Sequence, residues 1–138
     1  MSRLSRGEKI GQITSAFPHW FSSNFAHYSG KESSMNFDQH MLLALTAPRK
    51  LYITSASEDS WNDPEAEFAS CYYASEVYSA YGLAGLISTS DRLPALREVL
   101  HEGNIGYHLR AGGHDLSAFD WMQFLNFWAR HSGPNSSR

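Results

Sequence analysis

Apolar runs at two places along the chain predict two buried strands. Residues 50–56 (KLYITSA) are rich in β-branched and aromatic side chains, and residues 104–112 (NIGYHLRAG) form a second such run. Residues that break regular structure bound both runs, as is typical of short strands inside a sheet.

Helical patterns surround these strands. Asp38 is a suitable N-cap for an apolar helix that must end before Pro48. Residues 63–82 predict a second helix, with Pro64 at its first position. Residues 117–131 (SAFDWMQFLNFWARH) place apolar and aromatic side chains at helical spacing and predict a third.

Two further segments are less distinctive. Residues 20–28 form an aromatic stretch in which we expect a short helix, and residues 93–103 fit either a helical turn or two or a loop. The order helix, strand, helix, loop, strand, helix is typical of an α/β fold with parallel strands. Residues 1–131 are interpreted as one domain, and residues 132–138 (SGPNSSR) as a flexible tail.

Two parallel strands make a poor sheet, because parallel strands need cover on both faces and normally lie within a larger sheet. The chain is therefore interpreted as part of a fold, or as a fold completed by another copy. An uncovered strand edge pairs readily with a second copy, so we expect a homo-oligomer.

Composition narrows the possible partners. Of the 138 residues 42% are hydrophobic and 14% aromatic, which excludes a disordered chain. A net charge of −3 with scattered basic residues gives no reason to expect nucleic acid or an anionic membrane as a partner. Cys71 is the single cysteine, so no intrachain disulfide is possible, and we expect it to be a core thiol.

The candidate chemistry follows the two strands. Asp59 comes three residues after the first strand and His114 follows the second, in the segment RAGGHD. In doubly wound hydrolases an acid and a histidine on such loops meet at one edge of the sheet, where the carboxylate orients the imidazole. Glu58 is adjacent to Asp59 and stays open as the alternative acid.

Longer stretches strengthen this interpretation. The segments FDQHMLLALTAPR (37–49), EDSWNDP (58–64) and GYHLR with GGHD (106–115) together resemble the C-terminal half of a bacterial glucuronoyl esterase, a carbohydrate esterase of the α/β-hydrolase superfamily. The resemblance covers most of residues 4–131. It implies the C-terminal part of a three-layer α/β-hydrolase sandwich, with few parallel strands flanked by helices.

The resemblance also implies roles for individual residues. The family's catalytic base maps onto His114, and the acid that some bacterial members use maps onto Asp59. The tryptophan that lines the uronate pocket maps onto Trp61, and a glutamate near the substrate sugar maps onto Glu8. No metal or organic cofactor is implied. The N-terminus has no apolar signal segment, so the chain as given is expected to be cytoplasmic, although the family is often secreted.

One part of the family pattern is absent from the 138 residues. The family's serine lies in a G-C-S-R-x-G-K elbow, which this sequence does not contain. We therefore expect a truncated domain that retains a His–Asp pair without its usual nucleophile. Activity would then need a substitute nucleophile, a second chain, or attack by water that His114 assists. Ser57 and Ser60 are the nearest spare hydroxyls, and neither is favoured.

Other conspicuous residues have simpler explanations. His40 lies in an apolar helix and His108 inside a strand, so we expect both to be packing residues. The histidines lack metal-binding spacing, so no metal site is expected. A further set is expected to pack against the sheet from the last helix: Trp121, Phe124, Phe127 and Trp128.

Two functions follow from the sequence. The favoured one is hydrolysis of carboxylic esters, either small acyl esters or uronate and other carbohydrate esters, through His114 and Asp59. The alternative is a non-catalytic, truncated remnant that oligomerises and at most binds sugar weakly around Trp61.

Overall fold

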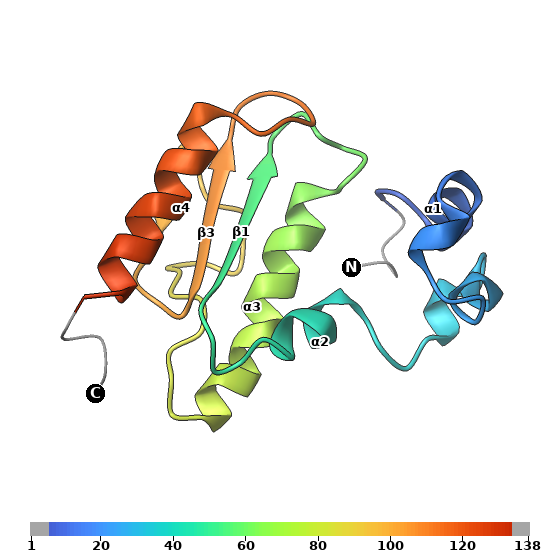
Figure 1. Ribbon diagram of the computed structural model, residues 1–138, viewed down its shortest axis with the longest axis horizontal. Helices are drawn as coiled ribbons and strands as arrows, with labels where there is room; N and C mark the ends of the chain where they lie inside the picture. The colour runs from blue at the N-terminus through green and yellow to red at the C-terminus, as the bar shows by residue number, and fades with distance from the viewer. Residues whose placement is uncertain (1–5, 134–138) are drawn as a thin grey trace.

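The computed structural model describes residues 6–133. It contains a three-stranded mixed sheet with strand order β1-β3-β2 (Figure 1). Strand β1 spans Leu51–Ala56 and β3 spans Ile105–Arg110, and the two pair in parallel along their whole lengths. Both predicted strands and their parallel pairing are confirmed.

Three predicted helices are also confirmed. Helix α2 is Gln39–Ala44, and the Asp38 side chain accepts a hydrogen bond from the Gln39 N–H at its start. Helix α3 is Pro64–Ala80, with its proline in the first turn. Helix α4 is Ala118–His131 and begins with a capping box, in which Ser117 and Asp120 each accept from the other's backbone N–H.

Alternation along β3 divides its side chains between two helices. The core on one face combines Ile105, Tyr107 and Leu109 with apolar side chains of α3, including Phe68 and Cys71. The other face meets α4, and a Cβ added at Gly106 would lie 2.8 Å from the Phe127 ring. Figure 1 shows α3 and α4 on opposite sides of the two parallel strands.

Cys71 is a core thiol, as predicted. Its side chain is fully buried, and burial, with a smaller contribution from the charge of Glu67, raises the pKa of the thiol to about 12. The thiol is therefore inert at neutral pH. His40 packs at 5.9 Å from Tyr73, and His108 is fully buried, as expected for packing residues.

The segment from residue 93 to 103 differs from both alternatives considered. It contains strand β2, Val99–Leu100, which pairs antiparallel with His108 and Tyr107 of β3. A two-residue strand has too short a pattern to be seen in the sequence, and its partner strand decides its conformation. The described sheet is therefore mixed rather than wholly parallel.

The N-terminal part of the structure holds a short helix and three single turns. Residues 20–28 do not form one helix; the 3₁₀ turns η1 (Pro18–Trp20) and η2 (Phe25–Tyr28) occupy this region instead. Helix α1 (Ile10–Ala16) was not predicted, because only Ile10 of its seven residues is buried and no periodic pattern arises. The remaining turn is η3 (Glu32–Ser34).

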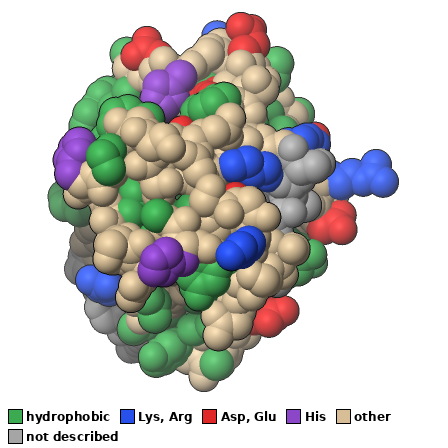
Figure 2. All heavy atoms as spheres, turned by 90° about the vertical axis from the view of Figure 1, so that its right-hand side faces the viewer, with side chains coloured by type: hydrophobic (Ala, Val, Ile, Leu, Met, Phe, Trp, Pro, Cys, Tyr) green, Lys and Arg blue, Asp and Glu red, His purple; other side chains and the backbone are tan. Residues whose placement is uncertain are grey.

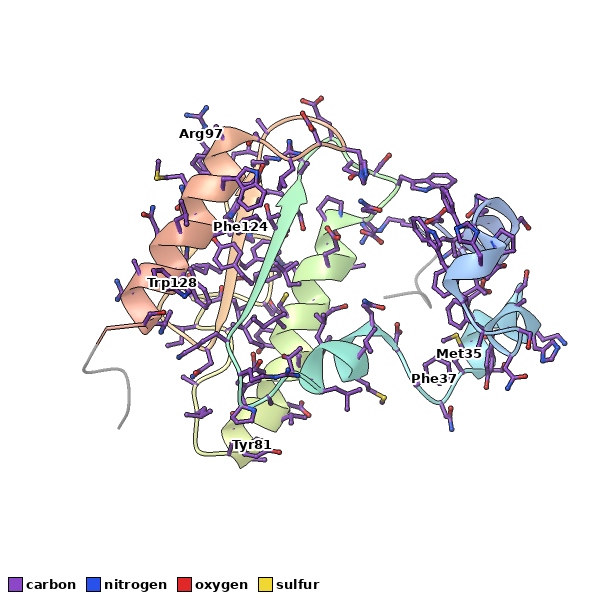
Figure 3. The ribbon with its side chains drawn as sticks, viewed as in Figure 1. Met35, Phe37, Tyr81, Arg97, Phe124 and Trp128 are labelled. Carbon is purple, nitrogen blue, oxygen red and sulfur yellow. The ribbon has the colours of Figure 1, made fainter. Side chains whose placement is uncertain are left out.

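Packing of α4 is only partly as predicted. Phe127 is buried, and Phe124 lies 5.2 Å from the Tyr52 ring on the sheet side of α4 (Figure 3). Trp121 and Trp128 are 57% and 67% exposed, so the prediction that they pack against the sheet is wrong. The apolar side chains occupy more of the helix circumference than a three-stranded sheet covers.

The full three-layer sandwich of an α/β-hydrolase needs more strands than the described residues provide, so that part of the fold stays a prediction. The tail assigned to residues 132–138 falls mostly outside the described residues. None of the helices within residues 6–133 is long and apolar enough to cross a membrane.

Candidate functional site

The loops that follow β1 and β3 are joined by backbone hydrogen bonds. The last residues of the strands, Ala56 and Arg110, are register partners. Beyond them the Ser57 N–H donates to the Arg110 carbonyl at 2.9 Å, and the Glu58 N–H donates to the Gly112 carbonyl at 2.9 Å. The two loops therefore leave the sheet side by side, at the edge where parallel α/β sheets bind ligands.

This edge brings Asp59 and His114 into direct contact. Asp59 Oδ2 lies 2.8 Å from His114 Nδ1. The Asp59 side chain is 8% exposed, whereas that of His114 is 80% exposed. An ionised carboxylate oxygen only accepts hydrogen bonds, so a hydrogen bond between these two atoms requires the proton on Nδ1 and leaves Nε2 as the basic nitrogen. Within residues 6–133 no hydrogen bond to His114 Nε2 is present.

Asn62 contacts both Asp59 and His114, and the sequence analysis did not identify it. Its backbone N–H donates to Asp59 Oδ1 at 3.3 Å, and its side-chain Nδ2 donates to Asp59 Oδ2 at 2.8 Å. Nδ2 also lies 3.0 Å from His114 Nδ1. The only signal in the sequence is its position three residues after Asp59, which allows the aspartate to accept from the N–H of a turn.

Glu58, the alternative acid, does not join the pair. Its side chain is exposed, and the turn closed by the Asp59 N–H on the Ala56 carbonyl at 3.1 Å directs the next side chain inward instead. The structure therefore separates two adjacent carboxylates that the sequence could not distinguish.

A cavity of about 150 Å³ contains the pair. Besides Asp59 and His114, its lining includes Asn62, Glu67 and Arg110. Burial raises the pKa of Glu67, although a hydrogen bond from the Ser55 hydroxyl at 2.6 Å opposes this shift. The cavity is small and polar, so it suits the reacting group of a substrate rather than a whole sugar.

Trp61 and Glu8 line a separate, neighbouring cavity of about 300 Å³. The Glu8 N–H donates to the Trp61 carbonyl at 2.7 Å, which joins the N-terminal segment to the loop after β1. The two cavities share Asn62 and Glu67. Trp61 therefore lines a cavity adjacent to the one that contains Asp59 and His114.

Ser57 and Ser60 do not share a cavity with His114. Both line a third cavity, with Arg6 and Leu93, and neither lines the cavity that contains His114. Ser55 does line that cavity, but its hydroxyl donates to Glu67.

Between residues 6 and 133, no group of three or more His, Cys, Asp or Glu side chains is arranged to hold a metal ion.

Behind the site, α4 is attached to β1 and β3 by a buried polar network. Asp120 is fully buried; its Oδ1 lies 2.8 Å from His108 Nε2 and accepts from the Thr54 hydroxyl at 3.1 Å. Its Oδ2 pairs with Arg110 Nε at 3.0 Å and accepts from the Ser117 hydroxyl at 2.7 Å. Burial works against ionisation of Asp120, yet these hydrogen bonds outweigh it and hold the pKa of the carboxyl below its usual value.

Figure 2 shows the surface on the side of the N-terminal segment. Lys and Arg side chains are dispersed over this face rather than gathered into a stripe, and apolar side chains lie among them.

The sequence of the chain matches known carbohydrate esterases. The family model described as glucuronyl esterase, fungi, matches residues 2–82. A carbohydrate esterase, MZ0003, from an unknown prokaryotic organism is 43% identical over 131 residues, which cover 95% of this chain and 30% of that protein. The 4-O-methyl-glucuronoyl methylesterase 1 of Phanerochaete chrysosporium is 37% identical over 65 residues, or 47% of this chain and 14% of that protein.

Solved structures give the same result. A promiscuous CE15 esterase from a marine bacterial metagenome superimposes with a TM-score of 0.88 at 43% identity, covering 94% of this chain and 32% of that one. A glucuronoyl esterase from Solibacter usitatus gives a TM-score of 0.79 at 42% identity, covering 88% of this chain and 30% of that one.

Carbohydrate esterase MZ0003 thus matches almost the whole of this chain, but the chain spans only 30% of the length of that relative. The chain's fold and its sequence both correspond to about a third of those enzymes. The chain belongs to the glucuronyl esterase family of carbohydrate esterases.

Proposed function

We propose that this chain carries the acid–base part of the active site of a carboxylic ester hydrolase. His114 is the general base and then the general acid, and Asp59 orients its ring. The observation that supports this most directly is the 2.8 Å contact from Asp59 Oδ2 to His114 Nδ1, with the imidazole otherwise exposed. A buried carboxylate behind an accessible imidazole is the arrangement that acyl transfer requires.

The proton transfers follow from the tautomer. His114 Nε2 takes the proton of an attacking hydroxyl, which belongs to a serine or to water. The hydroxyl oxygen forms a bond to the ester carbonyl carbon at the same time. The imidazolium formed is stabilised by Asp59 and then gives its proton to the leaving alkoxide as the carbon–oxygen bond breaks. These steps need no metal or organic cofactor.

We propose a uronate ester as the substrate. The cavity of Trp61 and Glu8 adjoins the small cavity of His114, and the two share Asn62 and Glu67. A sugar ring stacked near Trp61 would place an ester on its carboxyl carbon close to His114. The relative from Phanerochaete chrysosporium is named a 4-O-methyl-glucuronoyl methylesterase, which agrees with this class of substrate.

Ester hydrolysis by purified chains tests the proposal. p-Nitrophenyl acetate and a methyl ester of glucuronic acid are the two substrates, and His114→Ala is the variant. Loss of a general base costs about 10²–10⁴-fold in rate, so we expect kcat to fall by that factor. The matched control is His27→Ala, because His27 is also exposed but lies in turn η2 of the N-terminal segment.

Equal rates for the wild type and His114→Ala would overturn the proposal and favour the non-catalytic remnant. Cleavage of the nitrophenyl ester alone would retain the hydrolase and reject the uronate substrate. A burst of one nitrophenol per chain would indicate a covalent acyl intermediate, whereas its absence would favour direct attack by water.

A further inference from the structure

The loop that carries His114 makes few contacts of its own. Residues 111 and 113–116 are exposed, and Gly112 has a φ of +100°, which favours glycine. The Gly112 carbonyl accepts from Glu58, and the Leu116 N–H donates to Asp115 Oδ1 at 2.7 Å. These two hydrogen bonds leave the peptide groups next to His114 to be held by something else.

Arg110 holds them. Its Nη1 donates to the Ala111 carbonyl at 3.0 Å, and its Nη2 donates to the Gly113 carbonyl at 3.0 Å and to the Asp115 carbonyl. Gly113 and Asp115 are the residues immediately before and after His114. One guanidinium therefore fixes the backbone on both sides of the histidine.

The guanidinium is itself held from behind. Arg110 is 8% exposed, and its Nε pairs with Asp120 Oδ2 at 3.0 Å. Asp120 is in turn bound by His108, Thr54 and Ser117, so the arginine is connected to both strands and to the start of α4. A planar donor with five N–H groups suits this task, whereas the ammonium of lysine could not reach all these acceptors at once.

We propose that Arg110 is the positioning residue for His114: by binding the Ala111, Gly113 and Asp115 carbonyls, it sets the approach of the imidazole to Asp59. The effect on catalysis rests on the proposed function, but the effect on the imidazole does not. Without the Arg110 guanidinium, the pairing of β1 with β3 remains, but the loop that carries His114 can move. The contact between His114 Nδ1 and the Asp59 carboxylate is then made only part of the time.

Nuclear magnetic resonance of the wild-type chain gives the first test. A guanidinium held at four donor–acceptor contacts should show separate, slowly exchanging Nη–H signals for Arg110. A single averaged signal would mean that the side chain rotates freely and would overturn the proposal. This measurement does not depend on whether a variant folds.

Arg110→Lys gives the second test, with Arg130→Lys as the control. Arg130 also pairs with a carboxylate, Glu102, but at the exposed far end of α4. Long-range ¹H–¹⁵N correlation reports which ring nitrogen of His114 carries the proton. We expect the Nδ1–H form to lose its dominance in Arg110→Lys and to persist in Arg130→Lys; unchanged tautomers in a folded Arg110→Lys would refute the proposal.

Kinetics separates positioning from substrate contact. If the chain hydrolyses esters, we expect kcat of Arg110→Lys to fall about tenfold or more with KM unchanged, because the ground-state complex is not altered. A raised KM with an unchanged kcat would assign Arg110 to the substrate and overturn the positioning role. If the wild type is inactive, the proposed function fails, and the tautomer measurement still decides the role of Arg110.

Discussion

At the scale of single residues, the loop after β1 shows how one turn selects between adjacent acids. Asp59 is buried and touches His114, whereas Glu58 is exposed. Asp59 Oδ2 accepts from both Asn62 and His114, so the carboxylate is held in one rotamer and its negative charge is directed at the imidazole.

Exchange of each acid for its amide tests this assignment. In Asp59→Asn the new side-chain N–H₂ donates to His114 Nδ1 and favours the opposite tautomer, with the proton on Nε2. We expect the rate of ester hydrolysis to fall by about 10²–10⁴-fold, as when a triad acid is replaced by its amide. Glu58→Gln, measured beside it, should retain the wild-type rate; a comparable loss there would contradict the choice of Asp59.

The positions of Asp59 and His114 could be predicted because both follow parallel strands, whose carboxyl ends meet at one edge. Asn62 could not be predicted, because its role depends on the direction of a side chain within an irregular turn. The same limit explains Trp61: the sequence places it on the correct loop, but only the backbone of residues 60–63 decides which of two adjacent cavities it lines.

At the scale of secondary-structure elements, residues of β1 and α4 surround His108 of β3 and keep its imidazole neutral. His108 Nδ1 lies 2.9 Å from the Tyr52 hydroxyl, and its Nε2 faces Asp120 and the Thr54 hydroxyl. Burial lowers the pKa of His108, with a smaller contribution from the charge of Arg110, although the hydrogen bond to Asp120 opposes the shift. A neutral ring that donates from Nε2 and accepts at Nδ1 satisfies both contacts.

This network predicts a loss of stability in mild acid. Because the pKa of His108 is lower in the folded state than its ordinary value of 6.5, the unfolded chain binds more protons below about pH 6.5. The contribution of His108 to the free energy of unfolding should therefore be largest above that pH and decrease as the pH falls below it. Each unit by which the pKa is lowered corresponds to about 1.4 kcal/mol.

Urea unfolding at a series of pH values measures this decrease. His108→Gln should flatten the pH dependence without abolishing it, since burial also lowers the pKa of His101. His27→Gln, at an exposed position, should leave it unchanged. An unaltered slope in His108→Gln would show that protonation of this ring does not distinguish the folded from the unfolded state. Asp120 acts in a different range, because its lowered pKa makes its contribution disappear only below about pH 4.

At the scale of the whole molecule, the helices and strands with the clearest sequence patterns are found in the structure. The sequence does not predict which apolar side chains stay exposed on the surface. Helices α2, α3 and α4 and the two parallel strands all follow from caps and apolar runs that local physics favours. Helix α2 packs on α3, and α4 packs on the sheet. The apolar positions of both helices exceed what these neighbours cover, and no local pattern reveals that excess. Leu45, the C-cap of α2, and Trp128 on α4 are 74% and 67% exposed.

These uncovered positions support the prediction of self-association. Strand β1 lies at the edge of the described sheet, where its outer N–H and C=O groups can pair with another strand. Burial of apolar surface contributes about 25 cal/mol per Å², so contact between two such faces favours a dimer strongly.

We expect sedimentation velocity at about 10 µM to show a dimer or larger species. Trp128→Lys should shift the equilibrium toward monomer, since a charge at the contact must be desolvated, whereas Arg130→Lys on the same helix should not. A folded wild-type monomer at that concentration would refute the prediction. It would mean that the exposed apolar side chains do not drive self-association.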